Sequence, residues 1–278
     1  MKITLVPTAG LCNRLNAITS GILYQKYHKD AQLYIYWEKS KECYAHFTDL
    51  FEPLDCIEIK PLRKFYLKPG RKKNLYIPDI LKKIYFDAYY NGNTINRNNF
   101  EKLTTGKQNI YVTSYNPFTP YEITSSLATF FKPTQELKER ISLITEQYED
   151  NVVGVHIRRT DNLASIKNNP IEKFYSLMDR EITINSNCRF YLSSDEESVK
   201  KDMTKRYGDR IIFSQLPLVR DDVEGMKGAV VDLYCLGATK KNYRLHKFYV
   251  LKHCIPIIRH RINRLTQYIH HKISIKNK

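Results

Sequence analysis

The chain has 278 residues, of which 42% are hydrophobic and 12% aromatic, and its formal net charge is +16. This length allows two small domains or one large one, and the apolar content excludes an intrinsically disordered chain. No apolar run approaches the roughly 18 residues that a membrane span needs. The first apolar stretch stops at Pro7, before the core of a signal peptide could form.

The charges and the cysteines are unevenly distributed. Residues 241–278 contain ten Lys or Arg and no Asp or Glu, which leaves +6 for residues 1–240. The strongly basic character therefore belongs to the tail. The six cysteines are scattered, with no C-x-x-C pair and no histidine at zinc spacing, and this pattern favours a reduced cytoplasm over secretion.

The first elements are predicted to be a strand, a turn and a helix. Residues Lys2–Pro7 predict a β-strand, and the turn that follows contains Gly10, Asn13 and Arg14. Apolar residues then recur at helical spacing at Leu15, Ile18, Ile22 and Leu23. The backbone amides and the helix dipole at such a turn can hold an anion, although many first turns of this kind bind nothing.

The following stretch is harder to interpret. Residues Gln32–Trp37 and Ile110–Val112 predict two further strands, while residues 38–130 as a whole are aromatic-rich, basic and interrupted by prolines. The charged loop Lys68–Lys73 lies near tyrosines, as in some RNA-binding surfaces. No RNA-binding signature accompanies it, so a solvated turn is the better interpretation.

The second half contains the most informative stretch. A predicted helix over Leu137–Tyr148 leads into the apolar run Val152–Ile157, which predicts a strand buried on both faces. Arg158 and Arg159 follow directly. Ligands of an open α/β sheet bind beyond the carboxyl ends of the strands, and guanidinium groups there suit phosphate oxygens. Composition alone supports equally well a solvated turn whose arginines pair with nearby acids.

Four more elements are predicted before the tail: a helix from Asn169-Pro170, strands over Cys188–Leu192 and Arg210–Ser214, and a helix over Val223–Leu236. We expect Asp195, which follows the first of these strands, to cap the next helix. Taken alone, Asp232 on the last helix is interpreted as a surface charge.

Several of these motifs resemble those of one enzyme family. The run His156-Ile157-Arg158-Arg159-Thr160-Asp161 resembles the H-x-R-R-x-D motif of the α1,2/α1,6/O-fucosyltransferase superfamily, which includes the nodulation fucosyltransferases. The turn at Gly10 is similar to the G-x-G-N-[RQ]-L signature of that family, with Cys12 in place of a glycine. The strand end at Asp195 and the Asp-Leu pair at Asp232 also resemble family features.

The resemblance implies an α/β fold of the GT-B type, with two Rossmann-like domains. It further implies GDP-β-L-fucose as donor, a glycan hydroxyl as acceptor, inversion at the anomeric carbon, and no metal or other cofactor. The residues implied to be catalytic are Arg158, Arg159 and Asp161, the arginines by holding the diphosphate and stabilising its charge. The residues implied to contact the donor are Gly10, Asn13, Arg14, His156, Arg158, Arg159, Asp195 and Asp232, the last of these facing the guanine base. A catalytic base is not assigned.

The predicted domains are an acceptor-side domain over residues 1–130, a GDP-fucose-binding domain over 131–240 and a basic tail over 241–278. After Lys240 the family pattern I-I-G-S-x-x-S-(S/T)-F-S-x-x-A is expected, and the chain does not match it. Back-translation of residues 241–254 with free third bases, followed by a shift of one base, yields K-I-I-G-S-T-N-S-T-F-S-S-I. We therefore hypothesise that the tail is read out of frame, which predicts that the second domain lacks its last strand and helices.

The sequence keeps two other functions open. One is a non-catalytic basic protein that binds nucleic acid or an anionic surface, and the other is a non-catalytic binder of nucleotide sugars. Nucleic acid is not the partner that we expect. We expect an enzyme of polysaccharide biosynthesis in the cytoplasm, in peripheral contact with the anionic inner face of the membrane through its basic tail.

Overall fold

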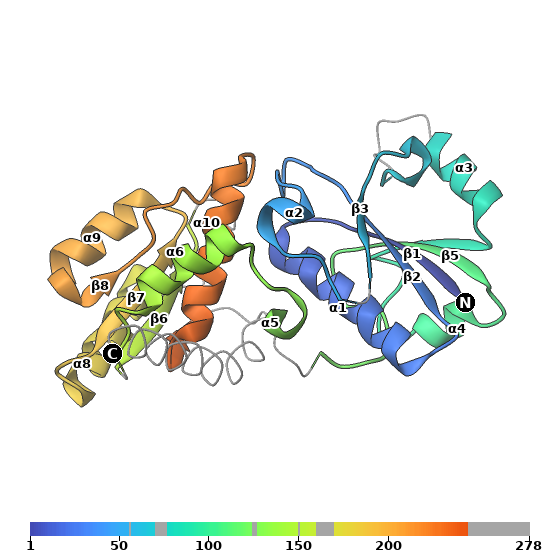
Figure 1. The fold of residues 1–278 in the computed structure, drawn as a ribbon. Helices are drawn as coiled ribbons and strands as arrows, with labels where there is room; N and C mark the ends of the chain where they lie inside the picture. Colours follow the sequence, from blue (N-terminus) through green and yellow to red (C-terminus); the bar gives the residue numbers. More distant parts are fainter. Residues whose placement is uncertain (56, 70–76, 124–126, 150, 160–169, 244–278) are drawn as a thin grey trace, which may run out of the picture. The chain divides into compact units, whose positions relative to one another are not determined.

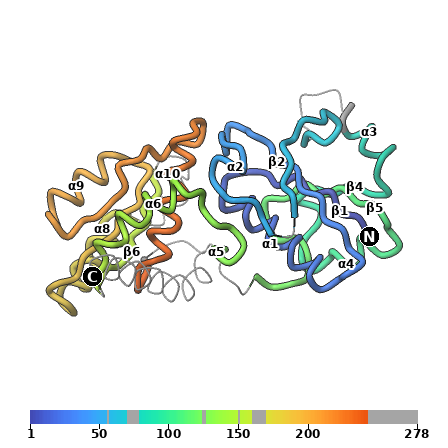
Figure 2. Tube along the Cα trace, viewed as in Figure 1, coloured from blue at the N-terminus to red at the C-terminus, as the bar shows by residue number. Residues whose placement is uncertain are grey.

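The chain folds into two α/β units. The computed structural model describes residues 1–55, 57–69, 77–123, 127–149, 151–159 and 170–243. The first unit comprises Met1–Thr134 and Arg220–Met226, and the second comprises Gln135–Val219 and Lys227–Lys278. Each unit is built on one parallel sheet with helices packed against it (Figures 1 and 2). Asp161 lies outside the described residues.

The sheet of the first unit has the strand order β3-β2-β1-β5-β4. Its strands are β1 (Lys2–Pro7), β2 (Gln32–Trp37), β3 (Ile59–Pro61), β4 (Ala88–Asn91) and β5 (Asn109–Ser114). Its helices are α1 (Leu11–Tyr27), α2 (Phe47–Leu50), the 3-10 turn η1 (Phe65–Leu67), α3 (Ile77–Tyr85), α4 (Phe100–Thr104) and α5 (Leu127–Phe130). The predicted strands over residues 2–7 and 32–37 are confirmed, and the strand predicted at 110–112 is longer by a few residues.

Side-chain patterns explain the positions of the strands in this sheet. In the central strand β1, Ile3, Leu5 and Val6 are all buried, as expected of a parallel strand that is covered on both faces. In β2, Leu33, Ile35 and Trp37 are buried, while Gln32 and Tyr34 are exposed. This alternation shows that one face of β2 packs against the core and that its other face is more exposed.

The sheet of the second unit has the order β8-β7-β6-β9. Its strands are β6 (Val152–Ile157), β7 (Arg189–Ser194), β8 (Ile211–Ile212) and β9 (Lys241–Tyr243). Its helices are α6 (Gln135–Thr145), α8 (Ile171–Ile184), α9 (Glu197–Tyr207), the 3-10 turn η2 (Gly208–Arg210) and α10 (Val223–Ala238), whose first turn belongs to the first unit. The strand predicted over 210–214 is reduced to two residues, and the helix predicted over 137–148 begins and ends earlier.

The core of the second unit lies between β6, β7 and the helices α8 and α9. Phe174 and Met178 of α8 are buried in it, four residues apart on one face of the helix that the sequence predicted. The prediction that β6 is buried on both faces is confirmed for all its residues except His156, which is half-buried. This buried strand carries the arginine pair at its carboxyl end.

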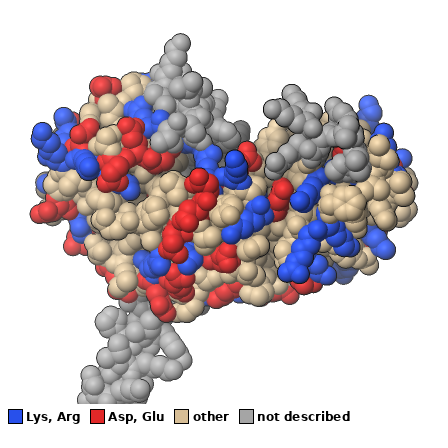
Figure 3. Space-filling model, turned by 90° about the horizontal axis from the view of Figure 1, so that it is seen from above, with Lys and Arg blue, Asp and Glu red and all other residues tan. Residues whose placement is uncertain are grey.

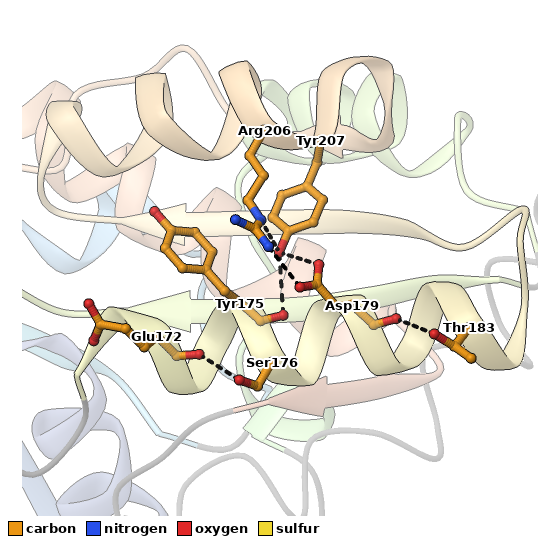
Figure 4. Close-up of polar contacts among 7 residues, drawn as sticks. All are labelled: Glu172, Tyr175, Ser176, Asp179, Thr183, Arg206 and Tyr207. Carbon is orange, nitrogen blue, oxygen red and sulfur yellow. Dashed lines mark hydrogen bonds and ion pairs between the residues drawn. The ribbon is translucent and has the colours of Figure 1, made fainter.

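Helices α8 and α9 are joined by polar contacts at the edge of this core (Figure 4). The Tyr207 hydroxyl donates to Asp179 Oδ1 at 2.9 Å, and Arg206 Nη2 donates to Asp179 Oδ2 at 2.8 Å. The Arg206 guanidinium also lies over the Tyr175 ring, 4.8 Å from its centroid. We call Tyr175, Asp179, Arg206 and Tyr207 the α8–α9 clasp.

Strand β9 forms directly after Lys240, at the start of the predicted tail. Lys241–Tyr243 pair in parallel with Val153–Val155 of β6. The approach is close because β6 has a glycine there: a side chain on Gly154 would collide with the Asn242 amide and lie 2.8 Å from Thr239 Oγ1. The remainder of the tail, residues 244–278, lies outside the described residues.

Candidate functional site

The carboxyl ends of β6 and β7 bring several predicted site residues to one edge of the sheet. These strands pair in parallel with His156 opposite Ser193 and Ile157 opposite Ser194. Arg158 and Asp195 are the first residues beyond the two strands. Because parallel strands end at the same edge, this is the position at which open α/β sheets bind ligands.

Asp195 fixes the loop that carries the arginine pair. The backbone N–H of Arg159 donates to Asp195 Oδ1 at 2.7 Å. The prediction that Asp195 caps the next helix is wrong: α9 begins at Glu197, its N-cap residue is Glu196, and no side chain caps it. The carboxylate instead holds the chain directly after β6, because the parallel register brings that backbone within its reach.

The arginines are neither buried nor fully exposed. Arg158 and Arg159 are half-buried, as is His156. A half-buried guanidinium keeps its charge and offers a planar set of donors, which suits the oxygens of a phosphate or diphosphate. The edge of this sheet is therefore a candidate site for an anionic ligand.

Asp232 is a core residue and not the surface charge that its sequence context indicated. Its side chain is buried in the second unit, where Oδ1 accepts a hydrogen bond of 2.5 Å from the Tyr191 hydroxyl. The Ser193 hydroxyl donates to the same carboxylate. Burial raises the pKa of Asp232 from 3.8 to about 6, and the two hydroxyl donors limit that rise. Through Ser193, this carboxylate is connected to the strand position opposite His156.

Tyr191 and Ser193 were missed by sequence reasoning. Tyr191 is fully buried, and burial, ahead of the nearby Asp232 charge, raises its pKa well above the ordinary value. The phenol therefore stays protonated and acts as a donor. Two serines at the strand end were the local indication of a polar site in the sequence. The partner of Tyr191 and Ser193, Asp232, lies on a helix about 40 residues further along the chain.

Gly10, Asn13 and Arg14 belong to the first unit, at the carboxyl end of β1. Gly10 is the N-cap of α1 with a φ of −71°, so its backbone conformation does not require glycine. Ala9 has the left-handed φ of 63°. Asn13 is half-buried.

Arg14 is buried in its own unit. Its Nε donates to the Ala9 carbonyl at 2.7 Å, Nη1 donates to the Glu38 carbonyl, and Nη2 donates to Ser40 Oγ at 2.7 Å. The guanidinium also lies over Trp37, 4.9 Å from the ring centroid. These contacts give Arg14 a structural role that joins the turn after β1 to the end of β2. The donor-binding roles of Gly10, Asn13 and Arg14 remain predictions.

In the described ranges no group of three or more His, Cys, Asp or Glu could hold a metal ion. The cysteines described there, at positions 12, 43, 188 and 235, form no disulfide. No helix in those ranges is long and apolar enough to cross a membrane. Metal independence remains a prediction.

Comparison with known proteins finds similarity in structure and not in sequence. No protein-family model and no curated protein matches the chain. A structure of NodZ α1,6-fucosyltransferase soaked with GDP-fucose matches with a TM-score of 0.56 at 14% identity, covering 91% of each chain. A structure of NodZ from Bradyrhizobium gives a TM-score of 0.55 with the same identity and coverage. Arabidopsis thaliana FUT1 in complex with GDP matches with a TM-score of 0.57 at 15% identity, covering 87% of this chain and 65% of that one.

These similarities establish the fold. The chain has the α/β GT-B fold of the fucosyltransferases, as the H-x-R-R-x-D resemblance implied, and that prediction is confirmed. Two parallel sheets, each covered by helices, correspond to the two predicted Rossmann-like domains.

Proposed function

We propose that this protein is a fucosyltransferase, which transfers L-fucose from GDP-β-L-fucose to a glycan hydroxyl with inversion and without a metal. The observation that carries the proposal is the fold match to NodZ over 91% of both chains. It is supported by the arginine pair at the carboxyl end of β6, the position at which the fold binds ligands. A role in polysaccharide biosynthesis belongs to the same proposal.

The chemistry requires stabilisation of a leaving group. As the bond between fucose C1 and the diphosphate breaks, positive charge develops on the sugar and negative charge on GDP. Arg158 and Arg159 would stabilise the phosphate oxygens, and preorganised donors are effective there because they do not have to reorient during the reaction. The hydrogen bond from Arg159 N–H to Asp195 keeps this loop in place. Inversion then follows when the acceptor oxygen attacks C1 from the face opposite GDP.

Calorimetric titration of the purified full-length chain with GDP-L-fucose tests the proposal. Saturable binding is expected, with no comparable heat from UDP-glucose. Arg158→Ala should weaken GDP-fucose binding by about tenfold or more, because a hydrogen bond to a charged group is removed.

Lys201→Ala is the matched control, because Lys201 is an exposed cation on α9 in the same unit. It should bind GDP-fucose as the parent does. A folded parent chain that fails to bind GDP-fucose, or an Arg158→Ala variant that binds it equally well, would contradict the proposal.

A further inference from the structure

The first unit has a pocket of its own, lined by residues that end or follow β2 and β3. Its volume is about 220 Å³, and it lies beyond the carboxyl ends of β2 and β3. Pockets that take drug-sized ligands measure roughly 300–1,000 Å³, so this one is suited to a single sugar unit. Its location at strand ends is again where α/β sheets bind ligands.

Basic and apolar side chains together line the pocket, and its charged lining residues are mostly basic. Lys39, His46, Arg63 and Lys68 line it together with one carboxylate, that of Glu38. Within the described residues neither Arg63 nor Lys68 forms an ion pair. In the view of Figure 3, Lys and Arg side chains gather on the visible face of this unit.

Arg14 and Tyr44 position one side of this pocket. Arg14 donates to the Glu38 carbonyl and to Ser40 Oγ, the residues on either side of Lys39. Lys39 Nζ lies over the Tyr44 ring, 4.1 Å from its centroid. The Tyr44 backbone N–H in turn donates to the Arg220 carbonyl at 2.9 Å. The segment between β2 and α2 is thus held at several points, so the pocket does not depend on a free loop.

We infer that this pocket binds a sugar unit carrying a negative charge, and that the acceptor glycan of this enzyme is anionic. Two lysines, an arginine and a histidine outweigh the single carboxylate, which disfavours a neutral ligand as the matched occupant. Arg63 supplies a planar fork of donors for a phosphate or carboxylate, while Glu38 can accept hydrogen bonds from sugar hydroxyls. As a statement about the acceptor, the inference rests on the proposed function, whereas the pocket's preference for anionic sugars does not.

The single tryptophan of the chain, Trp37, lines the pocket and provides a direct signal. We would titrate the full chain with glucose 6-phosphate, glucuronic acid and glucose, following tryptophan fluorescence and calorimetry on the same samples. The charged sugars are expected to bind and glucose is not. A preference between the two identifies a phosphate or a carboxylate as the recognised group.

The matched variants are Arg63→Ala and Lys60→Ala. Lys60 is a half-exposed cation on β3 that pairs with Glu58 and does not line the pocket. Arg63→Ala should weaken binding of the charged sugar by about tenfold, and Lys60→Ala should leave it unchanged. Equal binding of glucose, no binding of either charged sugar, or an unchanged affinity in Arg63→Ala would overturn the inference.

Titration with GDP-fucose on the same samples separates the two proposals. A chain that binds GDP-fucose but neither charged sugar refutes the pocket and leaves the proposed function standing. A chain that binds a charged sugar at Arg63 but not GDP-fucose refutes the proposed function and supports the pocket.

Discussion

Asp232 shows how one buried residue can link the core of the second unit to the sheet edge that carries the arginine pair. Its carboxylate accepts hydrogen bonds from Tyr191 in the middle of β7 and from Ser193 near the end of that strand. Removing a charge from water is costly, and two hydroxyl donors offset only part of that cost. The raised pKa of Asp232, about 6, is the consequence. The guanine-facing role implied by the family resemblance remains a prediction.

Asp232→Asn should therefore alter how stability depends on pH. The folded-state pKa of about 6 exceeds the ordinary 3.8, so the folded state binds the proton more tightly and this group destabilises the fold as pH rises through that window. The penalty is fully present above pH 6 and is up to about 3 kcal/mol, since one pKa unit corresponds to about 1.4 kcal/mol. Asparagine cannot ionise, so the Asp232→Asn variant does not carry this penalty.

The measurement is urea unfolding of parent and variant at pH 4 and pH 7. The free energy of unfolding of Asp232→Asn minus that of the parent should be larger at pH 7 than at pH 4. The same difference between the two proteins at both pH values would show that the carboxylate does not titrate in this window.

At the scale of elements, the α8–α9 clasp combines a half-exposed ion pair with a buried aromatic ring (Figure 4). Tyr207 packs in the core beside Phe190, with ring centroids 5.9 Å apart, and burial raises its pKa to about 12. Arg206 covers this ring from outside, and solvent screens its interaction with Asp179. The buried ring should therefore contribute more to the packing of α9 than the ion pair does.

Tyr207→Ala and Arg206→Ala test this ranking. Loss of the buried ring should lower the free energy of unfolding by about 3 kcal/mol or more, as large aromatic truncations do. Arg206→Ala should cause a much smaller change. Chemical denaturation of the two variants decides, and a larger loss in Arg206→Ala would reverse the assignment.

Strand β9 contains a poorly matched residue. Asn242 Oδ1 accepts from the Thr239 hydroxyl at 2.8 Å, but its buried Nδ2 has no hydrogen-bond partner among the described residues. The shifted reading frame places isoleucine at this position. An apolar β-branched side chain suits a strand beside β6 better than a buried, unpaired amide does.

Asn242→Ile is therefore expected to raise the free energy of unfolding by about 1–3 kcal/mol, the cost of an unsatisfied buried polar group. Thr239 keeps the Leu236 carbonyl as an acceptor at 2.8 Å. Asn242→Ala removes the amide without adding the apolar side chain of isoleucine, so it separates these two effects on stability. If Asn242→Ile is less stable than the parent in thermal unfolding, the amide belongs in this strand and the frame hypothesis loses this support.

For the whole molecule, charge is the property that the fold does not explain. Ten of the basic residues lie in residues 241–278, where acidic residues are absent. We propose that the protein acts in the cytoplasm and that its tail contacts the anionic inner face of the membrane. Each Lys or Arg near such a surface contributes on the order of 1 kcal/mol, and salt screens this attraction.

Sedimentation with lipid vesicles tests this proposal. The full chain should co-sediment with phosphatidylserine-containing vesicles at low salt and dissociate from them at high salt. It should not bind neutral vesicles. A chain ending at Tyr243 keeps β9 and should lose the binding. Equal binding by the shortened chain would assign the contact to the folded units instead.

The sequence by itself determined the local elements and the type of fold. The apolar run of β6 and the helical spacing of apolar residues in α1 are encoded by neighbouring residues, so both patterns are visible without coordinates. The arginine motif marked the strand end in the same way, because it follows β6 directly along the chain.

Only the tertiary structure decided which distant groups meet. Asp195 accepts from Arg159 instead of capping α9, Asp232 is buried against Tyr191, and Arg14 is engaged within its own unit. Basic residues from two segments also gather around one pocket beyond β2 and β3. These contacts join residues tens of positions apart, and they depend on strand order and register. Local propensity contains no information about either, because both follow from packing of the whole sheet.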